Sequence, residues 1–226
     1  MVNTPLETIT PLLSQEARER LSEMIEAIGR DPQAIDYLFP AAAREVARGP
    51  LDENDPGGML GPTVDDAVRG ALLVALCDTD TDAASRLRRV SDLYRFGDSD
   101  ERRAVLRHLH ELDLGSGPAA LVEDALRTND TRLIGAAMGP WSAAHLPAAQ
   151  WRHGVLKCLF TGVPLAAVED LHARADTELA RMVADFCRER VAAGRDIPPD
   201  ALPILDQFDD FLQQYPDVVA ARASDA

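Results

Sequence analysis

The sequence predicts an all-α protein of stacked antiparallel helix pairs, arranged as a HEAT-like or irregular α-solenoid. Nearly every segment repeats its apolar residues with the period of a helix, and none shows the sustained alternation of a strand. The hydrophobic content of 46% comes mainly from Ala, Leu and Val, with only 5% aromatic residues, and this composition favours helix–helix contacts. Two phrases, GDSDERRAVLRHLHEL and RADTELARMVADFCRERV, share an Asp, a Glu and then an apolar stripe, as repeated helical units do.

We expect residues 1–215 to form a single all-helical domain and residues 216–226 to be a disordered acidic tail. Capping residues, prolines and glycines set the expected helix boundaries. In chain order the expected helices run from Ser14 to Gly29, from Asp31 to Arg48 with a break at Pro40, from Thr63 past Leu76, Ala83–Tyr94, Glu101–Leu112, Ala119–Arg127, Arg132–Met138, from Pro147 to Gly162, Ala173–Ala193, and from Pro198 past Leu212.

Three of these helix boundaries have the clearest signals in the sequence. Thr63 is a good N-cap, and its helix is apolar on all sides over Ala71–Leu76, so we expect it at the centre of the core. Asp98 with Glu101 three residues later matches a capping box. Gly162, in the phrase Gly-Val-Pro, ends the helix that begins at Pro147. The predicted fold therefore rests on local signals along the chain.

The segment Gly49–Pro62 is rich in Gly, Pro and Asp and cannot form regular structure. It is either a surface connection between helix pairs or a lid over a site, and most long loops have no catalytic role.

Charge and cysteine content restrict the class of protein. The net charge is −15 and the pI about 4.6, which disfavours nucleic acid and anionic lipid surfaces as partners. Three cysteines without C-x-x-C spacing indicate reduced, buried thiols. The start MVNTPLETITPLL has no signal-peptide pattern and no apolar run is long enough to span a bilayer, so we expect a cytoplasmic protein without a transmembrane segment.

The histidines give no metal-binding pattern. His108 and His110 are two residues apart, and a helix would point them to different faces, whereas helical metal ligands are three or four apart. No nucleotide-binding or hydrolase motif occurs either. We expect neither a metal nor a cofactor.

Lys157 is the only lysine in the chain and stands beside Cys158. Helical geometry points Cys158 into the core with Trp151 and Val155, and points Lys157 to another face with His153, so the two cannot form a Lys-activated thiolate. Lys157 is then either a solvated charge or an ammonium that faces a ligand.

Other polar residues are candidates for ligand binding, each with a structural alternative. Asp98 and Arg102 beside Arg95 could hold a polar ligand, or form a cap with an adjoining ion pair. Asp130 would cap a helix, which leaves Asn129 free. Arg190 falls on the apolar stripe of its helix and needs an acidic partner such as Asp185, a carbonyl or a bound anion. The full candidate set is Arg95, Asp98, Arg102, Asn129, Asp130, Lys157, Asp185 and Arg190.

Four phrases together resemble the EboA-like family. They are LYRFGDSDERRAVLRHL (Leu93–Leu109), VEDALRTNDTRLI (Val122–Ile134), WRHGVLKCLFTGVPLAAV (Trp151–Val168) and LARMVADFCRERVAAGR (Leu179–Arg195). The resemblance implies an accessory protein of a specialised-metabolite pathway, with a small metabolite precursor or pathway proteins as partners. We expect a groove between helices to bind the metabolite or partner.

Two alternatives remain open. One is an enzyme that acts by general acid–base catalysis on an aromatic or polyketide-like intermediate, with Asp98, Asp130, Lys157 and Asp185 as candidate groups. The other is a helical scaffold without a ligand.

Overall fold

The computed structural model describes residues 4–224, which contain α- and 3-10 helices and no strand. This confirms the all-α class. The α-helices are α1 (Pro5–Ile9), α2 (Gln15–Arg30), α3 (Ile35–Glu45), α4 (Val64–Thr79), α5 (Ala83–Phe96), α6 (Ser99–His108), α7 (Ala119–Arg127), α8 (Thr131–Ala137), α9 (Pro140–His145), α10 (Ala148–Thr161), α11 (Leu171–Arg174), α12 (Thr177–Ala192), α13 (Leu202–Gln207), α14 (Asp209–Leu212) and α15 (Pro216–Ser224). The 3-10 helices are η1 (Thr10–Leu12), η2 (Pro32–Ala34), η3 (Leu109–Glu111), η4 (Leu165–Ala167) and η5 (Pro199–Ala201).

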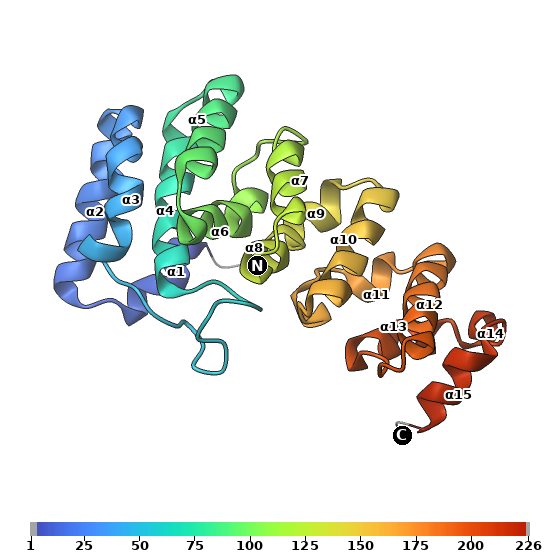
Figure 1. The fold of residues 1–226 in the computed structure, drawn as a ribbon. Coiled ribbons are helices and arrows are strands. Elements are labelled where there is room, and N and C mark those ends of the chain that lie inside the picture. The colour runs from blue at the N-terminus through green and yellow to red at the C-terminus, as the bar shows by residue number, and fades with distance from the viewer. Residues whose placement is uncertain (1–3, 225–226) are drawn as a thin grey trace.

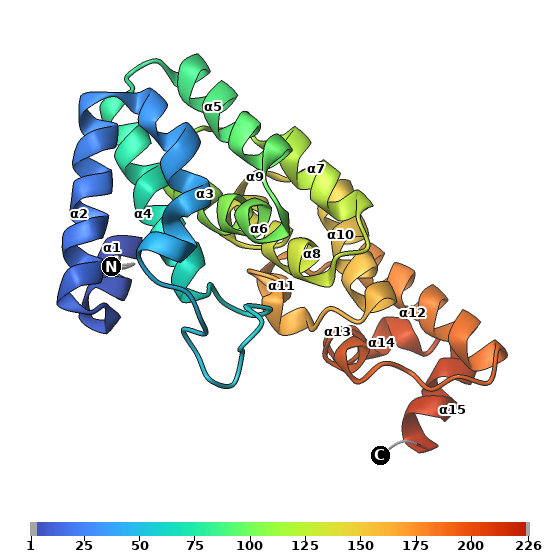
Figure 2. The same ribbon diagram turned by 60° about the vertical axis from the view of Figure 1, so that its left-hand side comes forward.

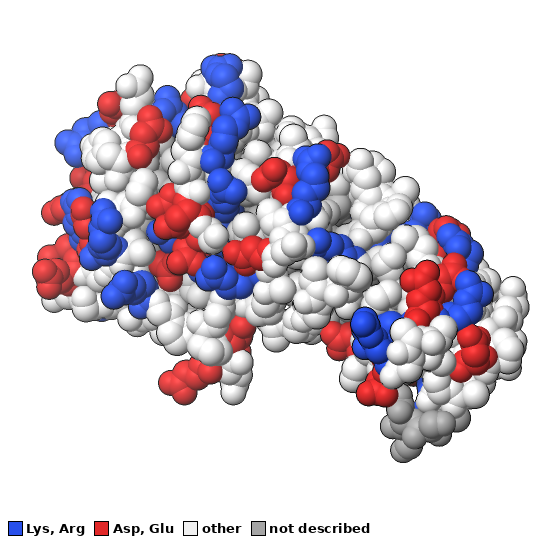
Figure 3. Space-filling view, in the orientation of Figure 1, with Lys and Arg blue, Asp and Glu red and all other residues white. Residues whose placement is uncertain are grey.

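The helices form an elongated body, with α2 and α3 at one end and α13 to α15 at the other (Figures 1 and 2). The loop between α3 and α4 projects from one side of this body. Acidic and basic side chains are interspersed over the face shown in Figure 3. No helix among residues 4–224 is long and apolar enough to cross a membrane.

Helix α4 lies at the centre of the N-terminal half, as its sequence predicts. It packs against α1, α2, α3 and α6, so every side of the helix meets protein. Leu72, Leu73 and Leu76 have no exposed surface. At its N-terminus the Thr63 hydroxyl accepts the backbone N–H of Asp66 in a capping box.

Helix α10 packs its apolar face into the core, which confirms the separation of Lys157 from Cys158. Trp151 and Val155 share that buried face with Cys158, which has no exposed surface. Burial raises the pKa of the Cys158 thiol to about 12, so it is not a nucleophile at neutral pH. Gly162 ends the helix with a φ of 77°, the left-handed conformation expected of a C-terminal glycine.

Four of the expected boundaries are wrong. Helix α6 ends at His108, where the 3-10 helix η3 begins, and not at Leu112. Helix α3 continues through Pro40 and does not break there. The helix expected from Ala173 begins at Thr177, because Asp176 caps it after the short helix α11. The last amphipathic helix is interrupted at Phe208, where α13 gives way to α14.

The expected disordered tail is also wrong over the part that is described. Pro216–Ser224 form α15, which packs against α12 and buries Val218 completely. Asp217 and Arg222 are the charged residues of Pro216–Ser224, and Val218 supplies its fully buried contact. Residues 225 and 226 lie outside the described residues.

Candidate functional site

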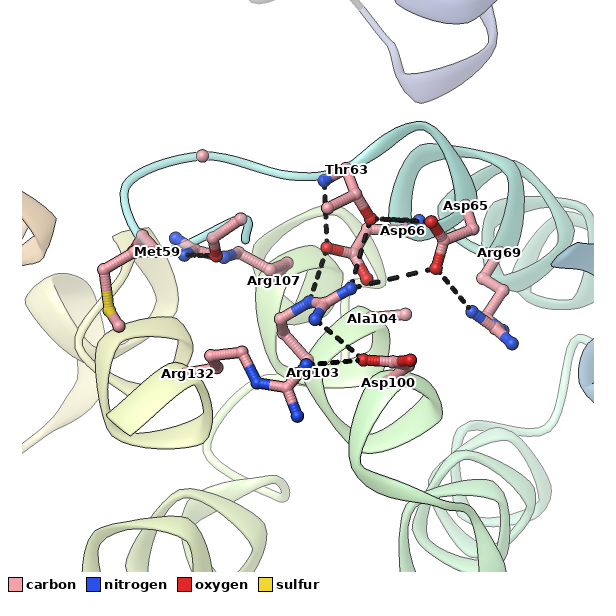
Figure 4. A network of polar contacts seen from close by, with 12 residues as sticks. Met59, Thr63, Asp65, Asp66, Arg69, Asp100, Arg103, Ala104, Arg107 and Arg132 are labelled. Carbon is pink, nitrogen blue, oxygen red and sulfur yellow. Dashed lines mark hydrogen bonds and ion pairs between the residues drawn. The ribbon is translucent and has the colours of Figure 1, made fainter. Parts of the chain in front are cut away.

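A network of ion pairs, buried at its centre, joins α4, α6 and α8 (Figure 4). Its centre is Arg103 on α6, whose side chain is 3% exposed. Arg103 donates through Nε to Asp66 Oδ2 at 2.8 Å, through Nη2 to Thr63 Oγ1 at 3.1 Å, and through Nη1 to Asp100 Oδ1 at 2.9 Å. Arg132 on α8 reaches the same Asp100 oxygen at 2.9 Å. The network thus ties the N-terminus of α4 to the two helices that follow it in space.

Each arginine of this network has a carboxylate beside it. Arg69 donates to Asp65 at 3.0 Å, and Asp65 lies 3.8 Å from Arg103. Arg132 is shared between Asp100 and Asp130, so three guanidinium groups face four carboxylates. A network of this kind, buried at its centre, fixes the helices in place.

The Gly49–Pro62 loop is held to the helices at its C-terminal end. Arg107 on α6 donates to the carbonyl oxygens of Gly58 at 2.8 Å and Met59 at 2.6 Å. Asp55 accepts three backbone N–H groups, from Met59, Leu60 and Gly61. Although partial burial alone would raise the pKa of Asp55, these hydrogen bonds hold it below its ordinary value. This anchoring favours a fixed connection over a lid.

A groove of about 450 Å³ runs between α10 and α12, and we call it the Lys157 groove. Its apolar wall consists of Leu156, Phe160, Met182 and Phe186. Its polar residues are His153, Lys157, Arg181, Asp185 and Glu189. Phe160 is 74% exposed, an unusual position for a large aromatic side chain. The groove therefore offers an aromatic surface beside charged groups.

Lys157 is the cation of the groove that has no carboxylate partner. Its Nζ donates to Asn129 Oδ1 at 3.1 Å, and no carboxylate of residues 4–224 lies within ion-pair distance of it. Arg181, by contrast, pairs with Glu178 at 2.7 Å and with Asp185 at 2.7 Å. A neutral amide oxygen orients the Lys157 ammonium without neutralising it, so an anion can still bind there.

The structure brings three predicted residues together at this groove: Asn129, Lys157 and Asp185. Asp185 accepts hydrogen bonds from Arg181, Arg188 and the hydroxyl of Tyr215. The Asp185 carboxylate is therefore already hydrogen-bonded to other residues of the protein.

Arg190 does not face the core as its stripe position predicts. The side chain is partly exposed, stacks over the Phe186 ring at 5.8 Å and donates to the carbonyl of Asp196 at 2.8 Å. Its position at the last turn of α12 lets it reach past the apolar stripe to the chain beyond the helix.

The other four predicted residues take structural roles and do not line the Lys157 groove. Asp98 forms the capping box of α6 with Glu101. Arg102 donates to the carbonyls of Gly97 and Arg95 and lies 5.5 Å from the Tyr94 ring centre. Asp130 caps α8 and pairs with Arg132 at 3.5 Å. Arg95 is exposed, and its backbone carbonyl accepts the hydrogen bond from Arg102.

Sequence reasoning missed several residues that matter here. Phe160 follows the helical periodicity of its neighbours, and only the structure shows that it is left uncovered. Asp66 and Arg103 are separated by 37 residues, so no local pattern connects them. His108 and His110 line one pocket, contrary to the prediction, because α6 ends at His108 and η3 turns the chain. No group of three or more His, Cys, Asp or Glu side chains among residues 4–224 is placed to hold a metal ion.

The family can be identified from a comparison with known protein families. The family described as "Metabolite traffic protein EboA" matches residues 60–206, more than half of the chain. The chain belongs to the EboA family. The matched region includes every residue that lines the Lys157 groove. Neither a curated protein nor a solved structure matches the chain.

Proposed function

We propose that this EboA-family protein binds a small, amphipathic, anionic metabolite in the Lys157 groove and holds it for transfer to a pathway partner. The observation that carries the proposal is the unneutralised Lys157 ammonium next to the exposed ring of Phe160. The ammonium would bind the anionic group of the metabolite, and the apolar wall would bind its ring or chain.

The size and shape of the groove support this role. A volume of about 450 Å³ lies within the range of ~300–1,000 Å³ that small-molecule sites occupy. The groove is open along its length, which suits a protein that must release its ligand unchanged. The family description, metabolite traffic, names this kind of task.

The alternative function, an enzyme that acts by acid–base catalysis, has less support than ligand binding, because of where the candidate carboxylates lie. Asp98 and Asp130 cap helices, and Asp185 accepts three hydrogen bonds, so none presents a free carboxylate to a substrate. A specialised-metabolite pathway in the cytoplasm, implied by the resemblance of the four phrases to the family, remains the setting that we propose.

The finer arrangement of the fold is part of the proposal. One continuous cluster of buried apolar residues extends from Ile9 to Val218, which supports a single domain. Consecutive helices also pack in pairs, as α5 does with α6 and α7 with α8, and this supports an irregular solenoid over a globular bundle.

The groove is tested by replacing Lys157 with methionine, which keeps the length of the side chain and removes its charge. 2-Naphthoate serves as the probe because it joins an aromatic body to a carboxylate. We expect Lys157→Met to weaken 2-naphthoate binding about tenfold in isothermal titration calorimetry, the loss of one charge-assisted hydrogen bond. The uncharged 2-naphthamide should bind both proteins equally.

Arg88→Met is the matched control, because Arg88 is an exposed cation on α5 that pairs with Asp82 and does not line the groove. It should leave the affinity for 2-naphthoate within twofold of the wild type. Equal binding of 2-naphthoate to wild type and Lys157→Met would remove Lys157 from the proposal.

A further inference from the structure

A second pocket of about 280 Å³ lies where α6 turns into η3, and we call it the histidine pocket. Its polar wall contains Arg107, His108, His110, Glu111 and Glu169. Small and apolar residues of α1 and of the segments around Gly61, Pro140 and Ala166 form the other walls. None of the residues that line the Lys157 groove lines this pocket.

His108 lines the pocket with an almost fully buried imidazole. The residue is 4% exposed, and its Nδ1 lies 2.9 Å from the carbonyl oxygen of Ala104. Because a carbonyl can only accept, Nδ1 carries the proton and Nε2 keeps its lone pair. Nε2 has no hydrogen-bond partner among residues 4–224. Gly70 on α4 makes room for the ring, since a Cβ there would collide with the imidazole.

Glu111 presents a carboxyl group that the fold leaves without a donor. Its side chain is 19% exposed, and Oε2 is buried without a hydrogen-bond partner. Oε1 lies 3.6 Å from Nε2 of His110, too far for a good hydrogen bond. Burial raises the pKa of Glu111 to about 7, so much of this carboxyl is protonated at neutral pH and can donate.

The charged neighbours of Glu111 do not cancel the rise in its pKa. Arg107 directs its guanidinium to the loop carbonyls, and burial lowers the pKa of His108 and of His110, which keeps both imidazoles neutral. Glu169 is the remaining ionisable group of the wall, and its side chain is exposed. The other walls contribute no ionisable side chain to the pocket.

We propose that the histidine pocket is a second binding site, for a small uncharged molecule with a hydrogen-bond donor next to an acceptor, such as a lactam. The O–H of Glu111 donates to the acceptor of the ligand, and Nε2 of His108 accepts from its donor. Oε2 of Glu111 is a buried polar atom without a partner in the fold, and an ordinary structure leaves few of these. The site is independent of the Lys157 groove and of its anionic ligand.

2-Quinolone, an uncharged bicyclic lactam, is the probe for this site. We expect it to bind the full-length protein at pH 6 and to bind about thirtyfold more weakly at pH 8.5, because only the protonated form of Glu111 donates. N-methyl-2-quinolone, which lacks the N–H that His108 accepts, should bind at least tenfold more weakly than 2-quinolone at pH 6. Titrations followed by NMR would measure both affinities.

Glu111→Gln is the decisive variant, since its amide donates at every pH. It should bind 2-quinolone with the same affinity at pH 6 and pH 8.5, whereas Lys157→Met should keep the pH dependence of the wild type. Three outcomes would overturn the proposal: no binding of 2-quinolone at pH 6, equal affinity of the wild type at both pH values, or an unchanged pH dependence in Glu111→Gln. Loss of 2-naphthoate binding in Lys157→Met would bear on the proposed function alone.

Discussion

Replacing Arg103 with alanine is expected to destabilise the protein by about 3–5 kcal/mol, the typical effect of removing one partner from a buried ion pair. The substitution leaves Asp66 buried with no exposed surface and without its cation. Only the backbone N–H of Thr63 would still donate to that carboxylate. The free energy of unfolding, measured by urea denaturation followed by circular dichroism, reports the loss.

Arg132→Ala is the control for this prediction, because Arg132 pairs with the same Asp100 oxygen but its side chain is 39% exposed. We expect a change below about 1 kcal/mol, as exposed ion pairs contribute little. If the two alanine variants were destabilised equally, burial of Arg103 would not be the source of its effect.

Replacing Glu111 with glutamine is expected to stabilise the protein at pH 8 by about 3 kcal/mol, the free energy that corresponds to a pKa raised from 4.5 to about 7. Burial raises the pKa of Glu111 from 4.5 to about 7, so between these values the folded state keeps a proton that the unfolded state releases. The free energy of unfolding of the wild type therefore falls as the pH rises through this window, and glutamine abolishes that loss. At pH 4, where both states are protonated, the variant and the wild type should be equally stable.

The difference between the two proteins is the quantity to measure, because His108 and His110 act in the opposite direction. Burial lowers the pKa of both, so they destabilise the folded state as the pH falls through 6.5, in the variant as in the wild type. Urea denaturation at intervals from pH 4 to pH 8 separates the two effects. Exposed Glu169, in the same pocket, provides the control: Glu169→Gln should change stability little at any pH. A pH-independent difference between Glu111→Gln and the wild type would show that the carboxyl ionises normally.

Local signals predicted much of the fold. The N-cap at Thr63, the capping box at Asp98 and the helix end at Gly162 depend on neighbours in the chain, and each is where the sequence placed it. Helical geometry alone predicted that Cys158 points into the core, where the structure places it. At these positions a few consecutive residues determine the outcome, and the prediction and the structure agree.

The remaining features depend on residues far apart in the sequence. The sequence around Arg103 does not distinguish it from the other arginines nearby. Its buried partner Asp66 lies 37 residues earlier, and only the folded structure brings the two together. Pro40 can stay within a helix because the surrounding core buries Leu38 and Phe39 and outweighs the missing hydrogen bond.

The candidate site was predicted in part for the same reason. Periodicity put Lys157 on a polar face, but its neighbours come from elsewhere in the chain: Asn129 from the connection between α7 and α8, and Phe186 from α12. The histidine pocket needed the change from α-helix to 3-10 helix after His108, and no residue type signals that change.

The proposal that the Lys157 groove carries a metabolite is tested most directly by what the protein retains when purified from its own cells. Wild type and Lys157→Met would be isolated under identical native conditions, and their small-molecule extracts compared by mass spectrometry. We predict that the wild type retains an anionic compound with an apolar ring or chain, and that Lys157→Met retains at least tenfold less of it. Extracts without any such compound, or with equal amounts from both proteins, would contradict the proposed function.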